Sequence, residues 1–197
     1  MISPPTDPAA AIAEAVADYR RTGDVAALLD RLAAAAEGAS VEELAAAVEP
    51  HRDVPEIAGP IYERIVARCP DDARALVILA NAYWLSGRGP DVVGELAARA
   101  LAADPSNRGA WHMWALTEGD PRARTERWRQ ITRRFPEDDL AHAALADNAA
   151  SLASSENDPV ALKLAIDAYE HLLRRADRPE QRRALEGALT TLKGWRL

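Results

Sequence analysis

Histidine, cysteine and paired acidic residues are the side chains from which a catalytic or metal site is usually built, and this sequence offers few of them. It contains four histidines, at the scattered positions 51, 112, 142 and 171, and one cysteine, Cys69. His112 and His142 lie on the first helices of two neighbouring predicted helix pairs and could in principle share a metal ion with Asp147. However, no pair among these residues has the local spacing usual for protein metal ligands. We therefore predict that the histidines serve in packing or in a binding surface, and that no metal or cofactor is bound.

Cys69 and the acidic N-terminal region are the remaining candidates for catalysis. Cys69 ends a predicted helix directly before Pro70, where a small, half-buried apolar side chain is more usual than a nucleophile. Glu42, Glu43 and Glu49 would need a pocket that shifts the pKa of a carboxyl group, and the sequence shows no sign of one. It also lacks a dinucleotide fingerprint, a phosphate loop and an H-E-x-x-H zinc motif. The sequence predicts that the protein is not an enzyme.

Two clusters of arginine could bind an anion such as phosphate. The first comprises Arg122, Arg124, Arg127, Arg129, Arg133 and Arg134, and the second comprises Arg174, Arg175, Arg178, Arg182 and Arg183. The alternative is a charged outer face with helical ion pairs such as Glu118 with Arg122 and Glu170 with Arg174. We favour this alternative, because residues 111–197 carry 14 basic and 14 acidic side chains. We expect no binding to nucleic acid at physiological salt.

Length and composition indicate an ordinary globular protein. The chain has 197 residues, of which 48% are hydrophobic and 28% charged, and its net charge is −7. Its longest apolar run, residues 75–85, includes Asn81 and is far shorter than the roughly 20 residues that span a bilayer. The N-terminus lacks a basic segment typical of secretion signals, and a single cysteine cannot form an intrachain disulfide. All but two of the 24 basic residues are arginine, a usage that we associate with GC-rich bacterial genomes. We expect a cytoplasmic bacterial protein that does not enter a membrane.

One helical pattern recurs along the chain. Apolar side chains at offsets 0, 3, 4 and 7 lie on one face of a helix, and they first occur at Ile12, Ala15, Val16 and Tyr19. The pattern starts again at Val41, Leu76, Trp111 and His142, in steps of 29 to 35 residues. After each copy comes a breaker and a second amphipathic stretch that ends in proline or a polar turn. A period near 34 predicts stacked helical hairpins; an irregular helical bundle is the competing fold.

These helix pairs resemble tetratricopeptide repeats, whose pattern includes small and aromatic residues at fixed places. The third copy carries the resemblance best, with Leu76, Leu79, Ala80, Tyr83, Gly87, Ala100 and Pro105. The resemblance covers residues 9 to about 178 and implies an all-α, right-handed superhelix of antiparallel helix pairs. We expect repeats near 9–37, 38–71, 73–106, 108–137 and 139–178, with a capping helix at 179–193. Together they would form a single domain, 9–197, after a disordered or extended tail at 1–8.

The resemblance also implies a groove lined by the first helix of each pair. By alignment, the groove residues are Arg74, Val77, Ile78, Asn81, Trp84, Leu85, His112, Met113, Leu116 and Asp147. Glu14, Glu42, Glu43 and Glu49 would make one end of it acidic. Asn81 would hold the backbone of a ligand, Trp84 and Met113 would supply contact area, and Trp114 would lie in the core. The family's clamp for C-terminal carboxylates is not expected, because only Asn81 fits it.

The predicted function is therefore a non-enzymatic interaction module, an adaptor, scaffold or chaperone-like protein. Its groove would take a peptide or helix of a partner protein that presents apolar side chains beside one or two basic residues. The groove side chains could instead merely pack between repeats. Two other hypotheses remain. The protein could be a self-associating structural protein, or a regulatory subunit or companion of an enzyme or toxin. We expect a monomer or a homodimer.

Overall fold

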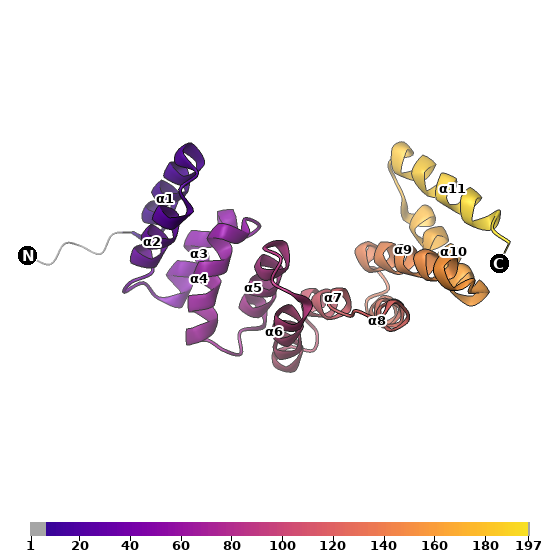
Figure 1. Ribbon diagram of the computed structural model, residues 1–197, viewed down its shortest axis with the longest axis horizontal. Helices are drawn as coiled ribbons and strands as arrows, with labels where there is room; N and C mark the ends of the chain where they lie inside the picture. The colour runs from indigo at the N-terminus through magenta and orange to yellow at the C-terminus, as the bar shows by residue number, and fades with distance from the viewer. Residues whose placement is uncertain (1–6, 197) are drawn as a thin grey trace, which may run out of the picture. The chain divides into compact units, whose positions relative to one another are not determined.

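The chain is helical throughout residues 7–196, the part that the computed structural model describes, and these residues contain no strand (Figure 1). The first helix of each successive pair is α1 (Pro8–Thr22), α3 (Val41–Val48), α5 (Ala73–Leu85), α7 (Arg108–Leu116) and α9 (Asp139–Glu156). The second is α2 (Val25–Ala35), α4 (Pro55–Arg68), α6 (Pro90–Ala103), α8 (Pro121–Arg134) and α10 (Pro159–Arg175). A 3-10 turn, η1 (Glu49–His51), follows α3, and α11 (Pro179–Lys193) follows the last pair. The predicted all-α fold class is confirmed.

Local sequence signals set where these helices begin. Proline occupies the first position of the later second helices and of α11, at Pro55, Pro90, Pro121, Pro159 and Pro179. Its missing N–H needs no partner at that position, and its fixed φ suits the first turn. Aspartate side chains accept backbone N–H groups at several starts, including those at Asp24, Asp72, Asp120, Asp138 and Asp158. These signals allow short connections, so consecutive helices turn back on one another.

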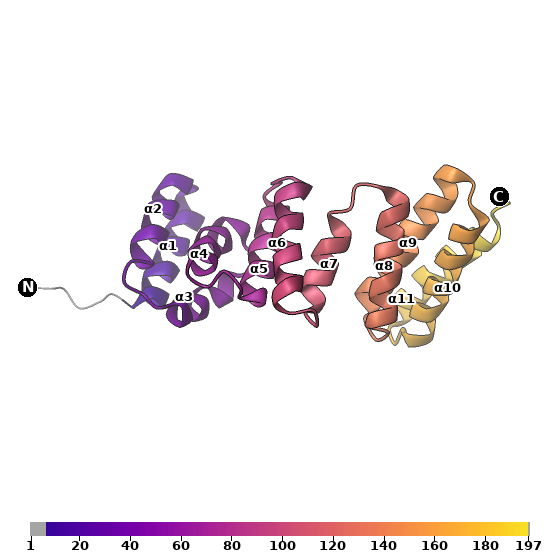
Figure 2. The ribbon, with the colours of Figure 1, turned by 90° about the horizontal axis from the view of Figure 1, so that it is seen from below.

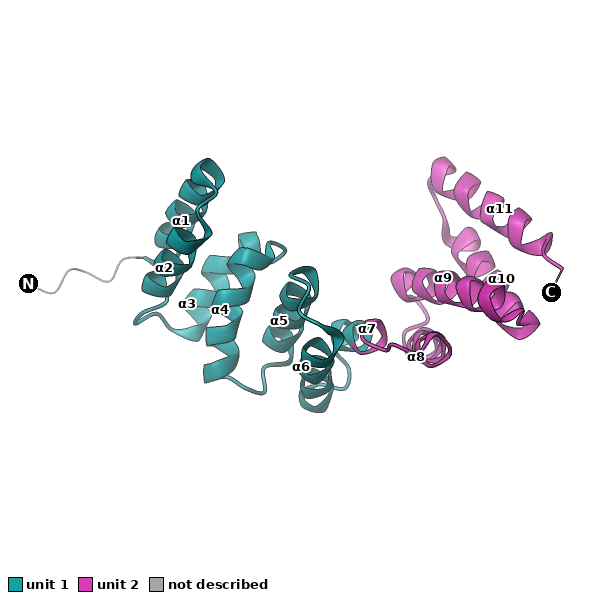
Figure 3. Cartoon of the chain, viewed as in Figure 1, with its two compact units in different colours: residues 1–113 teal, residues 114–197 magenta. Residues whose placement is uncertain are grey.

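The chain divides into two compact units, residues 1–113 (unit 1) and 114–197 (unit 2), and the boundary falls inside α7 (Figure 3). The single domain expected over 9–197 stays a prediction. Most of the tail expected over residues 1–8 lies outside the described residues, and Pro8 already begins α1. Of the helices described, none is both long and apolar enough to cross a bilayer.

Unit 1 has a core of bulky aliphatic side chains shared between consecutive helices. In it, α4 packs on α5 and α5 packs on α6, a pair that lies side by side in Figure 2. The fully buried side chains are Ile12, Leu28, Leu32, Leu44, Val48, Ile57, Ile61, Ile65, Leu76 and Val93. Each such side chain contributes about 1.5–3 kcal/mol by leaving water. Ile12, Leu44 and Leu76 come from the recurring pattern, so that pattern does define this core.

Unit 2 has a core built largely from alanine. Its fully buried residues include Ala141, Ala146, Ala149, Ala153 and Ala165, together with Ile131. Small side chains let α9 and α10 approach closely. Leu192 of α11 and Trp195 then pack against Ala149 and Ala165, so α11 covers an apolar face that α10 would otherwise expose.

Three details of unit 2 differ from the predictions. Trp114 is half-buried rather than in the core, with the Arg127 guanidinium 4.4 Å from its ring centre. The two predicted helical ion pairs are wrong. Glu118 pairs with Arg127, Arg122 with Glu156 and Asp158, and Glu170 with Lys193. These long side chains form ion pairs with groups on other helices or loops. The four-residue spacing rule considers only pairs within one helix, so it does not predict them.

Candidate partner-binding groove

One face of α5 forms the floor of an open pocket in unit 1. Arg74, Val77, Ile78 and Asn81 follow one another at helical spacing of three, one and three residues, so their side chains share that face. They line a pocket of about 260 Å³. The rest of its wall comes from Arg52, Asp53 and Asn107. The structure thus brings four of the predicted groove residues together in what we call the α5 pocket.

The opposite face of α5 fixes how the helix is rotated. Leu76, Leu79 and Ala80 are buried, and α5 packs on both α4 and α6. At its start, the carboxylate of Asp72 accepts the backbone N–H of Ala75 at 3.0 Å. With this face buried and the helix start capped, Val77 and Ile78 must point into the pocket.

The start of α7 completes the pocket. The side chain of Asn107 accepts the backbone N–H of Ala110 at 3.1 Å, and so caps α7. Two residues later, a Cβ atom on Gly109 would lie 2.9 Å from Cγ1 of Val77. Such a distance is too short for two carbon atoms, so glycine is what allows α7 to begin this close to α5. Asn107 therefore lies at the rim of the α5 pocket because it caps the start of α7.

Sequence reasoning missed three of the pocket residues, Arg52, Asp53 and Asn107. All three lie in segments that precede a helix, whereas the alignment transferred only positions within first helices. Asn107 had a detectable signal, since asparagine directly before a helix is a common cap. Arg52 and Asp53 follow η1, and no local pattern marks them.

The rim of the α5 pocket is polar and its charges compensate one another. Glu49 accepts hydrogen bonds from Arg52 and from Arg74, each at 2.9 Å, and Arg52 also lies 3.8 Å from Asp53. These ion pairs are exposed and can exchange partners at little cost. The pocket therefore combines an apolar floor with an edge that offers both guanidinium and carboxylate groups.

Two more predicted residues extend the same face of α5 beyond the pocket. Trp84 and Leu85 lie seven residues after Val77 and Ile78, and are 39% and 56% exposed. Neither lines the pocket itself. Together with Val77 and Ile78 they make an apolar stripe, which we call the α5 face.

The remaining predicted groove residues differ in how they are placed. Met113 is only 5% exposed, so it cannot supply the contact area expected of it. His112 is half-buried. Leu116 and Asp147 belong to unit 2, where Leu116 is exposed. Asp147 accepts a hydrogen bond from the Tyr169 hydroxyl; burial, followed by this hydrogen bond, raises the pKa of Tyr169 to about 12.

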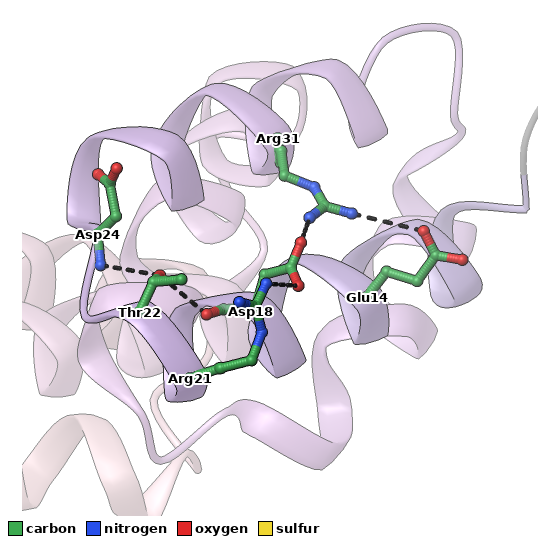
Figure 4. A network of polar contacts seen from close by, with 6 residues as sticks. All are labelled: Glu14, Asp18, Arg21, Thr22, Asp24 and Arg31. Carbon is green, nitrogen blue, oxygen red and sulfur yellow. Dashed lines mark hydrogen bonds and ion pairs between the residues drawn. The ribbon is translucent and has the colours of Figure 1, made fainter.

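Of the residues expected at an acidic end, Glu49 alone borders the α5 pocket through its ion pairs. Glu14 faces Arg31 of α2, and Figure 4 shows the same guanidinium on Asp18 of α1. Hydrogen bonds from Arg21 and then Arg31 hold the pKa of Asp18 below its ordinary value. These contacts tie α1 to α2, so Glu14 has a structural partner.

Glu42 and Glu43 lie in the first turn of α3. The Glu43 side chain accepts the backbone N–H of Ser40, and the Ser40 hydroxyl accepts the backbone N–H of Glu43. This reciprocal arrangement is a capping box, which stabilises the start of a helix. Glu42 is exposed. Neither of these two lines the α5 pocket.

The described part of the chain offers no group of side chains for a metal ion. Among residues 7–196, no group of three or more His, Cys, Asp or Glu side chains is placed to hold a metal ion. Cys69 is half-buried at the end of α4. The α5 pocket brings together an apolar floor and exchangeable polar groups.

Comparison with known proteins relates this arrangement of helices to solved repeat structures. No family model and no curated protein matches the sequence. The structure of MamA superposes with a TM-score of 0.61 at 18% identity, covering 82% of this chain and 96% of that one. A second structure, MamA MSR-1 C2, gives 0.57 at 18% identity over 87% and 100% of the two chains.

Two further structures are described as repeat proteins. TTC0263, a thermophilic TPR protein of Thermus thermophilus, gives a TM-score of 0.58 at 17% identity, with coverage of 93% of this chain and 99% of that one. A tetratricopeptide repeat protein from Parabacteroides merdae gives 0.52 at 13% identity, over 95% and 88%. At such identities the likeness concerns the fold alone. The resemblance to tetratricopeptide repeats is thus confirmed at the level of structure, and this chain has the tetratricopeptide-repeat fold.

Proposed function

We propose that the protein is a non-enzymatic interaction module that binds a peptide or helix of a partner protein across the α5 face. The observation that carries this proposal is the α5 pocket, where Val77 and Ile78 form an open apolar floor beside the Asn81 amide. Ligand sites commonly combine apolar walls with a few convergent polar groups. The fold supports the proposal, since first helices of such repeats commonly bind peptides.

The lining of the pocket indicates what kind of segment it accepts. Val77 and Ile78 provide a floor for one apolar side chain, and Trp84 adds a large exposed surface farther along α5. The Asn81 side chain can both donate to and accept from a peptide backbone. Glu49 and Asp53 can exchange an arginine of this chain for a basic residue of the ligand. Residues 1–60, with 4 basic and 11 acidic side chains, add long-range attraction for a basic segment.

Peptide selection tests the proposal even though the partner is unidentified. A random peptide library is selected against the full chain, and the recovered peptides are measured against Val77→Asp and Asn81→Ala variants. Val25→Asp is the control, because Val25 is an exposed valine of unit 1 that does not line the pocket.

We expect peptides that pair an apolar anchor with a basic residue. Val77→Asp should lower their affinity about tenfold or more, because a carboxylate on the floor removes the apolar contact and must lose water when an apolar anchor binds. Val25→Asp should bind as the unaltered chain does. Recovery of no peptide, or equal binding by all variants, would contradict the proposal. Light scattering measures the molar mass in solution and so tests the self-associating alternative. In that case the unaltered chain would be a dimer, and Val77→Asp would dissociate it.

A further inference from the structure

Unit 2 contains a second pocket of different character, which we call the histidine pocket. It measures about 320 Å³ and lies among α8, α9 and α10, which follow one another in Figure 2. Its polar and charged lining consists of Arg129, Thr132, Arg133, His142, Asp167, His171 and Arg174. Three arginines and two histidines face it, against one aspartate. Its lining is therefore predominantly basic.

Two of the arginines have no acidic partner. Arg133 of α8 and Arg174 of α10 are exposed, and no carboxylate of residues 7–196 forms an ion pair with either. The neighbouring charges are already committed: Arg129 pairs with Glu126, Arg175 with Glu137 and Asp139, and Asp167 with Lys163. Guanidinium groups on two different helices therefore remain available to one ligand.

Two imidazole rings line the same pocket as these arginines. The rings of His142 (α9) and His171 (α10) stack with their centres 3.7 Å apart and their planes 11° from parallel. His142 Nε2 lies 3.1 Å from the carbonyl of Pro136, to which it donates a hydrogen bond. Within the described chain, Nδ1 of His142 and Nε2 of His171 are buried and have no hydrogen-bond partner. Leaving a buried polar atom unpaired costs stability, so such atoms call for an explanation.

The position of His142 in the repeat sharpens that explanation. In the four preceding first helices the equivalent residues are Ile12, Val41, Leu76 and Trp111, all apolar. The corresponding place in unit 1, among α4, α5 and α6, is also a pocket, but Val66, Leu79, Val92 and Leu96 line it together with Glu63 and Glu95. Arg99 also lines that pocket, so the same inter-helix site is largely apolar with two glutamates and one arginine in unit 1, and predominantly basic in unit 2. His142 keeps the hydrogen bond that Trp111 Nε1 donates to the carbonyl of Pro105, but its unpaired Nδ1 faces a basic pocket.

We propose that the histidine pocket binds a phosphate-class oxyanion, held by Arg133 and Arg174, with His171 as a further hydrogen-bond donor. Guanidinium groups suit phosphate because they present several N–H donors in one plane. A volume of about 320 Å³ leaves room for a phosphoryl group and the atoms that carry it. Free phosphate and the phosphoryl group of a modified residue share this chemistry.

The charges around His171 predict how binding depends on pH. Arg129 and Arg133 face it from α8, His142 and Asp139 from α9, and Arg174, Arg175 and Asp167 from α10. Burial, followed by the charges of His142, Arg174 and Arg175, lowers the pKa of His171, so its ring is neutral at neutral pH. A bound dianion favours the protonated ring and raises that pKa. By linkage, the dianion binds more tightly as the pH falls, down to about pH 6, where the phosphoryl group itself takes up a proton.

The test is an NMR titration of the full chain with inorganic phosphate, in which the imidazole proton resonances are followed. Single His→Gln variants assign these resonances. Chloride keeps the ionic strength constant. We expect saturable shifts for His142 and His171, a raised pKa for His171, and unchanged His51 and His112. A second arm uses N-acetyl phosphoserine amide, and tighter binding of this compound than of inorganic phosphate identifies a phosphorylated residue as the source.

Matched variants decide whether the pocket is responsible. The double variant with Arg133→Ala and Arg174→Ala should bind phosphate about tenfold or more weakly, because each substitution removes a charge-assisted hydrogen bond. Arg183→Ala, which removes an exposed arginine of α11 outside the pocket, should leave binding unchanged. Shifts of all four histidines alike, shifts that do not saturate, or equal binding by the double variant would overturn the proposal.

Discussion

Units 1 and 2 repeat the same helix pair, yet they place opposite kinds of side chain at equivalent positions. On the exposed face of α5, Val77, Ile78 and Asn81 form a pocket, whereas the same positions of α9 hold Ala143, Ala144 and Asp147. At the start of the pattern the contrast is between an apolar and a polar side chain, with Leu76 in unit 1 and His142 in unit 2. The repeat fixes where helices lie, and the departures from it occur at the two pockets that we propose as binding sites.

A large difference in stability is expected between the two starting positions themselves. Leu76 is 0% exposed, so Leu76→Ala should lower the free energy of unfolding by about 2–5 kcal/mol through lost burial and a cavity. His142→Ala should cost about 1 kcal/mol or less, because the ring is half-buried and already leaves one nitrogen unpaired. Denaturant unfolding followed by circular dichroism measures both. Equal losses would show that the two positions serve the same structural purpose.

Tryptophan replacements separate core from surface in the two units. Trp128 is 3% exposed, and Trp128→Ala should cost about 3–5 kcal/mol of stability. Trp84→Ala should cost about 1 kcal/mol or less and instead weaken binding of selected peptides by about tenfold. Thermal unfolding and a peptide titration on each variant provide the comparison. A similar loss of stability for both would mean that Trp84 packs within unit 1 rather than facing a ligand.

Restoring the apolar residue at the start of α9 should stabilise unit 2. His142→Leu removes an unpaired buried nitrogen and adds aliphatic burial, and we expect a gain of about 1 kcal/mol. Binding of inorganic phosphate should weaken in the same variant. His51→Leu, on η1, is the matched control and should change neither property in unit 2. A destabilised His142→Leu protein would show that the histidine is there for packing.

The smallest effect is a pH dependence confined to unit 2. The pKa of His171 is lowered in the folded state, so the unfolded chain binds this proton more readily. Stability therefore rises with pH between the lowered value and the ordinary value of 6.5, and is lost on acidification through that range. Melting temperatures of the full chain and of His171→Gln, measured from about pH 7.5 to about pH 5.5, test this. His171→Gln should show the weaker dependence; an identical slope would contradict the assignment.

The fold class and the residues of the α5 pocket that share one helix could be predicted because both depend on local spacing. Offsets of three and four residues define a helix face, and proline and aspartate mark where helices begin. Arg52, Asp53 and Asn107 could not be found in the same way, since they join α5 only through the turns of the fold. The contact of His142 with His171 also spans two helices. The burial of Met113 depends on tertiary packing, which the spacing of residues in the sequence does not predict.

Ion pairs show the same division between local and tertiary information. A rule of four-residue spacing predicts that Arg122 pairs with Glu118, but its guanidinium contacts Glu156 and Asp158. The rule considers one helix in isolation, whereas an arginine side chain is long enough to reach the next. Predictions for charged side chains in helical repeats therefore need the neighbouring helix as well as the sequence of their own.

Amide chemical-shift mapping on the full chain tests most directly the claim that the α5 face of unit 1 binds a protein segment. A selected peptide is titrated into the ¹⁵N-labelled protein and the backbone resonances are followed. We expect saturable changes centred on Val77, Ile78, Asn81 and Asn107, with those of His142 and His171 unchanged. Changes centred on unit 2, or on no contiguous set of residues, would contradict the claim.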